Sequence, residues 1–388
     1  MRTGDQTLMK EINKSIVTDI IRSQHPVSRA RISEITGLNK ATVSSLIDEL
    51  IHEGLVIELG TGPSAVGRRP RMLGFNGRAG YAVGVAIDLH EVRFLLIDLL
   101  GKLEKSLVIA SPVGMEVEQT VYQVVDVVQQ IVQSAPSSPL GVIGVGIAVP
   151  GLVDFKKGVV WNAPNLHWMN IPLRKMLEAH LDLPVFIDNE SNMGAIAEQW
   201  LGKGQNYSNF VYLSVTTGLG SGIVVNRQLM RGSGGIAGEV GHMVVVVDGL
   251  LCSCGNRGCL EMYASEKALI EIFQQKSGKE VSTVEEIFQR AENGDVLAKA
   301  AISSVGRYLA TGMNNLIHTC NPESVIVGGR ITRFQSLLWE AIQPVLSKSM
   351  VDSFFHTKLE WSTLGQNAIS LGAASLVIDH RFAKPTIL

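Results

Sequence analysis

Hydrophobic residues near the start of the chain recur at helical spacing. One stripe repeats every four residues and predicts an amphipathic helix that ends at His25-Pro26, namely Leu8, Ile12, Ile16 and Ile20. Ser28 is a suitable N-cap for a short second helix, in which Ala30, Ile32 and Ile35 are expected to face inward. Thr36-Gly37-Leu38 predicts a tight turn, and Asn39 is a cap for a third helix that runs to about Glu53. Its expected buried face is Val43, Leu46, Ile47 and Leu50.

Helix, glycine-containing turn and helix together form the pattern of a helix-turn-helix motif. In this motif the first turns of the second helix reach base edges in the major groove of DNA. The polar residues at those turns, with one arginine from the helix before them, are therefore predicted to contact DNA: Arg29, Lys40, Thr42, Ser44 and Ser45.

A wing is predicted after the third helix. Residues 55–59 alternate like a strand, residues 60–67 turn the chain, and Gly67-Arg68-Arg69-Pro70-Arg71 follows. Arg68, Arg69 and Arg71 on a proline-stiffened ribbon suit phosphates or a narrow minor groove. Residues 1–75 hold ten Lys/Arg and eight Asp/Glu, whereas the whole chain has a net charge of −2. We predict a winged helix-turn-helix domain over residues 1–75; the alternative is a small helical protein-interaction domain with solvated arginines.

The rest of the chain alternates between buried strands and helices, which predicts an α/β body with two lobes. A pair of apolar strands over 81–88 and 92–98 is followed by a helix over 115–134 and a strand over 141–149. The same order of strand, tight turn and strand returns at 210–226. This repeated pattern predicts an internal duplication with one copy in each lobe.

Composition limits the class of protein. The chain has 388 residues, of which 46% are hydrophobic and 18% charged, so a disordered chain is excluded and two or three domains are expected. No apolar run follows the basic residue at the N-terminus, as a secretory signal requires. The charge-free stretch from Leu140 to Val153 is shorter than a spanning helix. We expect a cytoplasmic protein without a membrane partner.

A metal site is the strongest chemical signal. His242, Cys252, Cys254 and Cys259 place one imidazole and three thiols within eighteen residues. This set is typical of a closed tetrahedral Zn²⁺ site with a structural role, because no position remains for an activated water. The alternative is a loop with unligated thiols.

Carboxylates and amides surround that motif in the sequence. Asn189-Glu190, Glu239 and Glu261, with His242, supply the donors and acceptors that a polyol ligand needs. Spacing alone favours plain surface carboxylates over a ligand site.

Longer motifs resemble the ROK family (repressors, open reading frames, sugar kinases). Glu239-Val240-Gly241-His242 and the run from Cys252 to Glu261 match its joint motif, and Val149 to Val153 and Asp188 to Asn192 fit at the expected places. The resemblance covers roughly residues 80–388. With the predicted winged helix in front, the chain is similar to the repressor branch, and its opening most resembles repressors of bacterial xylose operons.

The resemblance implies a two-lobed actin-like (ribonuclease H-like) sugar-kinase fold with a sugar in the cleft between the lobes. The first lobe is expected over residues 76–195, completed by a C-terminal helix at about 366–388, and the second over 196–365. The residues implied to contact the sugar are Gly151, Asn162, Asn189, Glu190, Glu239, His242 and Glu261. Asn165 is expected to line the same cleft, and His242 to use one ring nitrogen for Zn²⁺.

Two departures from the family's kinases favour a repressor over an enzyme. The kinases have an Asp-x-Gly-x-Thr turn that admits phosphates, where this chain has Asp88-Leu89-His90-Glu91-Val92. Their catalytic aspartate is matched by Glu190. The glycine loop over 217–222 and Gly328-Gly329 keep the kinase-like form and are interpreted as remnants of the fold.

The hypothesis is a homodimer, or a higher homo-oligomer, that binds double-stranded operator DNA and is released by a monosaccharide, D-xylose or D-glucose. It has no catalytic residues. The alternatives are an ATP-dependent sugar kinase and a sugar-sensing scaffold for a protein partner. The sequence does not distinguish the two sugars, and it does not specify the operator.

Overall fold

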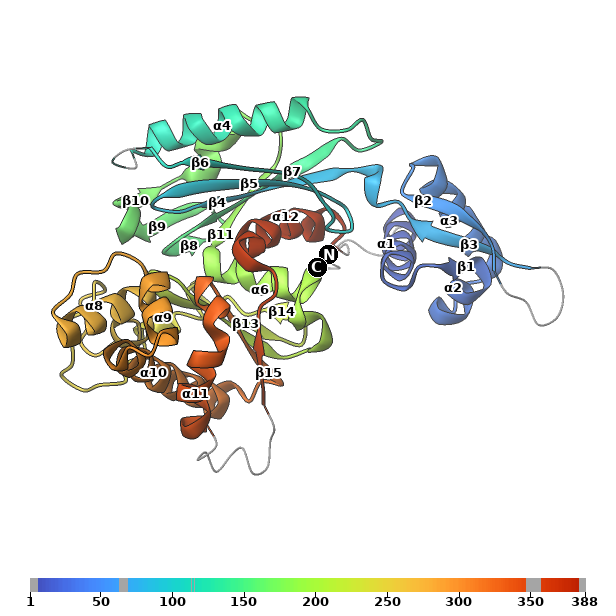
Figure 1. Cartoon of the computed structure of the whole chain (residues 1–388). Coiled ribbons are helices and arrows are strands. Elements are labelled where there is room, and N and C mark those ends of the chain that lie inside the picture. The colour runs from blue at the N-terminus through green and yellow to red at the C-terminus, as the bar shows by residue number, and fades with distance from the viewer. Residues whose placement is uncertain (1–5, 63–68, 113, 115, 347–356, 384–388) are drawn as a thin grey trace.

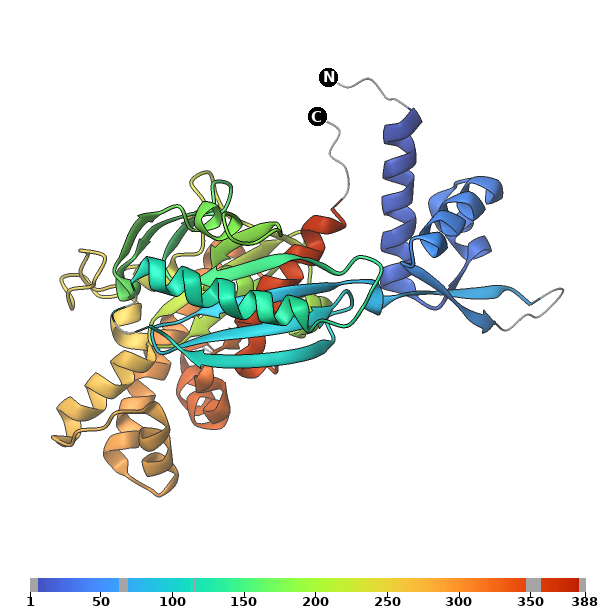
Figure 2. The same cartoon turned by 90° about the horizontal axis from the view of Figure 1, so that it is seen from above.

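A small head stands beside a larger body with two lobes (Figure 1). The structure is a computed structural model, which describes residues 6–62, 69–112, 114, 116–346 and 357–383. The head joins the body through the short connection between residues 75 and 81, and in the view from above it projects from one end of the body (Figure 2).

Three helices and a three-stranded sheet form the head. Its elements are α1 (Gln6–Gln24), β1 (Val27–Ser28), α2 (Arg29–Thr36), α3 (Lys40–His52), β2 (Val56–Thr61) and β3 (Arg71–Phe75), with sheet order β1-β3-β2. The predicted caps are present, since Ser28 Oγ accepts from the Arg31 N–H and Asn39 Oδ1 from the Thr42 N–H. Gly37 ends α2 in the left-handed conformation, φ +70°, which glycine adopts without strain. The result is a helix-turn-helix with a wing.

The buried face predicted for α3 is confirmed, but the prediction for α2 is partly wrong. Val43, Leu46, Ile47 and Leu50 are buried in the core of the head. In α2 only Ile32 is buried, whereas Ala30 and Ile35 are exposed. Helices α1 and α3 and strand β3 pack against α2, and of its residues this packing buries Ile32 alone.

The first lobe is a five-stranded sheet between helices. Its elements are β4 (Tyr81–Ile87), β5 (Glu91–Asp98), β6 (Leu103–Ala110), α4 (Val117–Gln133), β7 (Val142–Val149), β8 (Leu152–Asp154), β9 (Val159–Ala163), β10 (Trp168–Ile171), α5 (Leu173–Glu178), β11 (Val185–Asn189), α6 (Glu190–Leu201) and α12 (Ala368–Arg381). The valines of α4 pack on one face of the sheet, and α12 packs on β4 and β7 at the other (Figure 1). A Cβ on Gly146 would lie 1.9 Å from the Ala373 carbonyl oxygen, so α12 lies directly on the backbone of the sheet.

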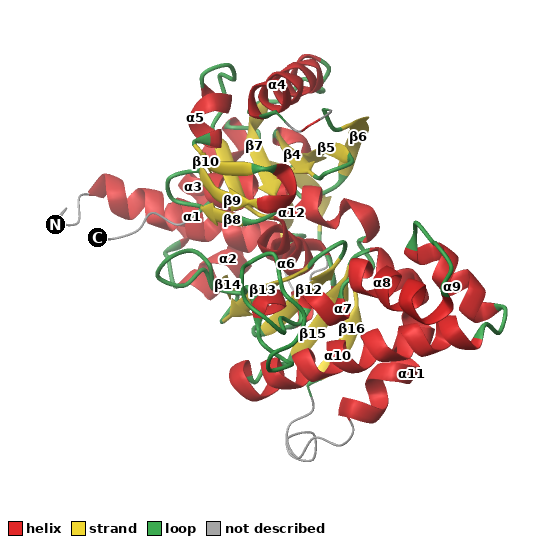
Figure 3. Cartoon of the chain, turned by 90° about the vertical axis from the view of Figure 1, so that its left-hand side faces the viewer, coloured by secondary structure: helices red, strands yellow, loops and turns green. Residues whose placement is uncertain are grey.

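The second lobe repeats this sheet. Its elements are β12 (Phe210–Val215), β13 (Leu219–Val225), β14 (Gln228–Leu229), α7 (Glu261–Ala264), α8 (Glu266–Ser277), α9 (Val284–Glu292), α10 (Val296–Cys320), β15 (Ser324–Gly328), α11 (Gln335–Leu346) and β16 (Lys358–Trp361). The strand orders β11-β7-β4-β5-β6 and β16-β15-β12-β13-β14 correspond strand by strand, with the same parallel and antiparallel pairs. The predicted duplication is confirmed, and the two sheets occupy separate lobes (Figure 3).

Helices α6 and α12 pack against each other between the two sheets. The boundary predicted between residues 195 and 196 falls inside α6, which continues unbroken to Leu201. Helix α6 packs on β12 and β13 of the second lobe, as α12 packs on β4 and β7 of the first. Within the described ranges, no helix combines the length and apolar character needed to cross a membrane.

Candidate functional site

A cleft of about 360 Å³ lies between the lobes. The ends of β7 and β11 form its first-lobe wall, and the turn between β12 and β13, with the loop after β14, forms the wall of the second lobe. Six of the seven residues implied to contact a sugar line this cleft: Gly151, Asn189, Glu190, Glu239, His242 and Glu261. They come from segments up to 110 residues apart in the chain, and the tertiary structure brings them together.

Asn162 is not among the residues that line the cleft. Strand β9 pairs it with Leu152 and places it behind Gly151, whose added Cβ would lie 2.3 Å from the Asn162 carbonyl oxygen. Gly151 has a φ of +90°, so both its conformation and its space require glycine. Asn165, two residues beyond β9, reaches the cleft instead. The sugar contact implied for Asn162 stays a prediction.

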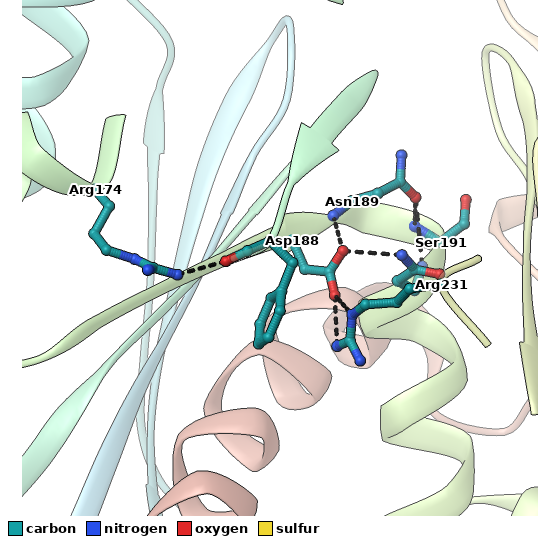
Figure 4. Close-up of polar contacts among 7 residues, drawn as sticks. Arg174, Asp188, Asn189, Ser191 and Arg231 are labelled. Atoms are coloured by element: carbon teal, nitrogen blue, oxygen red, sulfur yellow. Dashed lines mark hydrogen bonds and ion pairs between the residues drawn. The ribbon is translucent and has the colours of Figure 1, made fainter. Parts of the chain in front are cut away.

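The side chain of Asn189 is committed to the protein. Its Nδ2 donates to the Gly151 carbonyl oxygen at 2.8 Å, and its Oδ1 caps α6 by accepting from the N–H of Ser191 at 2.7 Å (Figure 4). Both ends of the amide are therefore engaged. Asn189 thus connects the ends of β7 and β11, which together form the first-lobe wall of the cleft.

Glu190 begins α6 inside the cleft. Burial, followed by the neighbouring carboxylates Asp88, Glu239 and Glu261, raises its pKa to about 7. At neutral pH the side chain is therefore close to its titration midpoint. A ligand hydroxyl that donates to Glu190 would favour its ionised form.

Glu190→Gln is expected to remove a pH dependence of stability in the sugar-free protein. Because its pKa is raised on folding, the stability that Glu190 contributes is fully present below its unfolded value of about 4.5 and is lost as pH rises through about 7. The free energy of unfolding of E190Q should therefore rise relative to that of the wild type between pH 5 and pH 8, by up to about 3 kcal/mol. Denaturant titrations across this range measure the difference, and parallel curves would contradict the assignment.

On the second-lobe side of the cleft, Glu239 and His242 face each other, with Glu239 Oε2 3.9 Å from His242 Nε2. Burial raises the pKa of Glu239, and the His242 imidazole opposes that shift. Glu261 Oε2 accepts from the backbone N–H of Leu219 at 3.1 Å, which ties α7 to the β12–β13 turn. Glu190, Glu239, Glu261 and the His242 imidazole thus form a set suited to the hydroxyls of a sugar.

The other ring nitrogen of His242 belongs to a cluster with three cysteines. His242 Nδ1 lies 3.6 Å from Cys252 Sγ, Cys254 Sγ lies 3.7 Å from Cys259 Sγ, and all four donor atoms lie within 4.8 Å of one another. Zn²⁺ with bonds of about 2.3 Å to sulfur and about 2.05 Å to nitrogen sets tetrahedral S–S and N–S separations of about 3.8 and 3.6 Å. The thiols of these cysteines are free. The donor set fits one tetrahedral ion, which would orient His242 toward the cleft.

Short backbone contacts shape the cysteine loop. The Cys252 N–H donates to the Asn256 carbonyl at 2.8 Å, and Cys259 forms a bridge with Val244. Gly258 has a φ of +78°, and a Cβ there would lie 1.6 Å from the Val246 carbonyl oxygen. Two stretches of chain therefore cross at Gly258, which brings Cys259 back to His242.

At the far end of the cleft, the turn after β4 has few free donors. The Leu89 N–H donates to Asp88 Oδ1 and the Asp88 N–H to the Glu91 carbonyl. Glu91 carries its carboxylate on the cleft and pairs with Arg93 at 2.6 Å. An approaching phosphate would meet side-chain bulk and a negative charge here instead of open backbone N–H groups.

The residues predicted to contact DNA lie on the outer surface of the head. Lys40 and Ser45 are exposed, Thr42 and Ser44 are half-buried, and all four lie on α3. Arg29 reaches the same helix, where its guanidinium donates to Asp48 Oδ1 at 2.7 Å and to the Ser44 carbonyl.

On the wing, Arg69 is exposed, and Arg71 is exposed but paired with Glu58 of the neighbouring strand. Arg68 lies outside the described residues.

Sequence reasoning missed two residues behind the cleft. Asp188, which is 2% exposed, binds Arg231 from the other lobe (Figure 4). Asp188 opens the Asp188–Asn192 motif, but 43 residues separate it from Arg231, so no local pattern could have paired the two.

Fold and site together define a class of protein: a winged-helix head on a two-lobed actin-like sugar-kinase fold, with a carboxylate-rich cleft beside a His/Cys cluster. The family model described as "ROK family" matches residues 82–380. The chain belongs to the ROK family.

Similar proteins span nearly the whole chain. A xylose repressor from Caldicellulosiruptor bescii is 38% identical, covering 98% of this chain and 99% of its own, and one from Bacillus subtilis is 39% identical, covering 98% of each. Among solved structures, a ROK family transcriptional regulator described as a homolog of the Escherichia coli MLC protein has a TM-score of 0.83 at 26% identity, covering 97% of both chains. A ROK family glucokinase from Streptomyces griseus, in complex with glucose and AMPPNP, has a TM-score of 0.68 at 29% identity and covers 76% of this chain and 99% of its own.

Proposed function

We propose that this protein is a sugar-responsive transcriptional repressor that binds operator DNA as a homodimer and releases it when a monosaccharide enters the cleft. The observation that carries the proposal is that one chain joins a helix-turn-helix head to a polar cleft between lobes. The full-length similarity to xylose repressors supports D-xylose as the inducer, with D-glucose as the other candidate. A structural Zn²⁺ bound by His242 and the three cysteines would support the sugar site.

A physical connection between cleft and head supports this proposal. Helix α6 begins at Glu190 in the cleft, and near its other end Trp200 Nε1 donates to Asp379 of α12 at 3.0 Å. The guanidinium of Arg22, on α1 of the head, lies 4.8 Å from the centre of the Trp200 ring. A sugar that moves the start of α6 would shift the surface on which the head rests.

Head and body also share one hydrophobic core. Residues of all three head helices pack into the same cluster as β5 and α12 of the first lobe, and Phe75 meets Phe382 edge-on at 5.9 Å. The head would therefore follow a movement of the first lobe. In a dimer, such a movement changes the spacing of two recognition helices, which must match half-sites in successive major grooves.

A sugar kinase is the second candidate, favoured by the likeness to the glucokinase structure. The turn from Asp88 to Glu91 argues against it, because bulky side chains and a carboxylate stand where the kinases have a glycine turn that admits phosphates. Glu190 also stands at the position of the kinases' catalytic aspartate. Its extra methylene displaces the carboxylate by about a bond length, which can cost about 100-fold in rate. We therefore propose that the chain has no kinase activity.

The deciding experiment is fluorescence-anisotropy binding at fixed salt to DNA from upstream of neighbouring sugar genes. We expect tight binding that D-xylose relieves, with D-glucose and no sugar as the comparison arms. Relief by another sugar would keep the repressor and change its inducer. Absence of specific binding, together with sugar-dependent ATP consumption, would establish the kinase instead.

Replacing Arg68 and Arg69 with alanine is expected to weaken binding to all DNA sequences alike. Each lost phosphate contact should reduce the slope of log K against log salt by about 0.9. Anisotropy titrations at several salt concentrations measure this slope, with Arg307→Ala, an exposed position on α10 of the second lobe, as the control. An unchanged slope would exclude the wing from the DNA interface.

A further inference from the structure

Arg231 crosses from one lobe to the other. It follows β14 in the second lobe, and its Nε and Nη2 donate to Oδ2 of Asp188, at the end of β11 in the first lobe, at 3.0 and 2.8 Å (Figure 4). Its guanidinium also lies over the ring of Phe155, which follows β8, at 4.1 Å from the ring centre. A single side chain of the second lobe thus holds two residues of the first.

The other oxygen of Asp188 is directed to the start of α6. Oδ1 accepts from the N–H of Asn189 at 2.8 Å and from Nδ2 of Asn192 at 2.9 Å. Both carboxylate oxygens are therefore satisfied, as a charge that is 2% exposed requires. Through Asp188, Arg231 is linked to the turn of helix that carries Glu190.

Arg231 also anchors the loop that carries Glu239. This loop, residues 230–242, starts next to Arg231 and ends at His242 in the His/Cys cluster. Inside the loop the Ala237 N–H donates to the Arg231 carbonyl at 3.1 Å, while Ile236 is 49% exposed and contributes little packing. The loop is thus held by a guanidinium–carboxylate anchor at one end and by the cluster at the other, and next to Glu239 the Gly238 carbonyl accepts from Ser221 Oγ at 2.8 Å.

We propose that Arg231 is a positioning residue of the sugar site, which holds the 230–242 loop over the cleft and makes sugar affinity depend on the contact between the lobes. The inference rests on the proposed function. Arg231 acts on the sugar through Glu239 and through Asp188, because it is not itself among the residues that line the cleft. Arginine suits this task, since its planar group can bind a carboxylate and stack on a ring at the same time.

The test compares Arg231→Met with Arg174→Met. Arg174 is a matched control because its guanidinium also contacts Phe155. It donates to the carbonyls of Phe155 and Lys156, but unlike Arg231 it lies in the same lobe as its partners (Figure 4). R231M is expected to raise the Kd for D-xylose by at least about tenfold, measured by calorimetry, while metal content stays at the wild-type level. R174M should leave the Kd within about twofold. A wild-type Kd in R231M overturns the proposal.

A second variant tests whether a loss of sugar affinity comes from the released loop or from the Asp188 carboxylate, which is left buried and unpaired when Arg231 is replaced. In Asp188→Asn/Arg231→Met the charge is gone but the loop is still without its anchor. The proposal expects the sugar affinity to stay low in this double variant. Recovery of wild-type affinity would show that the unpaired Asp188 caused the loss, and would overturn the proposal.

A measurement without sugar or DNA distinguishes this inference from the proposed function. Hydrogen exchange of the amides of residues 232–239 should be faster in R231M than in the wild type and unchanged in R174M. If the wild type binds neither sugar nor operator, the proposed function fails while this result still reports on the anchor. Equal exchange in R231M and the wild type would show that Arg231 does not hold the loop.

Discussion

Cys254→Ser is expected to abolish stoichiometric metal binding and to raise the Kd for D-xylose by roughly 100-fold. Loss of one thiolate would open the tetrahedral set, since Cys254 Sγ lies 3.7 Å from Cys259 Sγ and would share the proposed ion with it. His242 then loses the bond that orients its ring, and Glu239 loses the imidazole that faces it at 3.9 Å. Two hydrogen bonds to charged groups, at about 1.5 kcal/mol each, account for the expected loss of sugar affinity.

Metal content by mass spectrometry and sugar binding by calorimetry measure these two effects together. Cys320→Ser is the matched control, because Cys320 lies outside the cluster at the end of α10. Both quantities should be unchanged in C320S. Full sugar affinity in a metal-free C254S protein would refute the link between the metal and the sugar site.

Ser45→Glu is expected to lower operator affinity by roughly 100-fold or more while sugar affinity is kept. Ser45 is exposed on the outer face of α3, where a DNA phosphate or base edge would approach. A carboxylate placed against DNA costs several kcal/mol through like-charge repulsion. The side chain points away from the core of the head, so the fold should be unaffected.

The control for this variant makes the same change in charge far from the head. Gln133→Glu, at an exposed position on α4 of the first lobe, should leave operator binding unaltered. Anisotropy with operator DNA and calorimetry with sugar distinguish the two surfaces. Wild-type operator affinity in S45E would mean that α3 is not the recognition helix.

Most of the head could be predicted from its sequence, because its signals are local. Ser28 and Asn39 cap helices that begin one residue later, and Gly37 ends α2. The wrong prediction for Ala30 and Ile35 has a non-local cause, since their exposure depends on which side of α2 packs against α1, α3 and β3. The His/Cys cluster could also be predicted, because its four ligands lie within eighteen residues.

The family resemblance predicted the cleft between the lobes, and the tertiary structure showed which of the predicted residues line it. Asn162 pairs with Leu152 across β8 and β9 and is not among the residues that line the cleft, and the Asn189 amide, which does line it, also binds the backbone of Gly151 and Ser191. Each outcome depends on a neighbour distant in the chain. Residue type alone did not distinguish a ligand contact from a support.

By itself the sequence determined the caps of α2 and α3, the paired strands that begin each lobe and the four residues of the His/Cys cluster, since each of these signals depends on residues close together in the chain. Only the tertiary structure decided which polar side chains line the cleft, that Arg231 binds Asp188 across the lobes, and that Arg22 meets Trp200 at the base of the head. The physical reason is that hydrogen bonds, ion pairs and ring contacts act over a few ångströms. Which distant residues come that close depends on strand register and helix packing throughout the molecule.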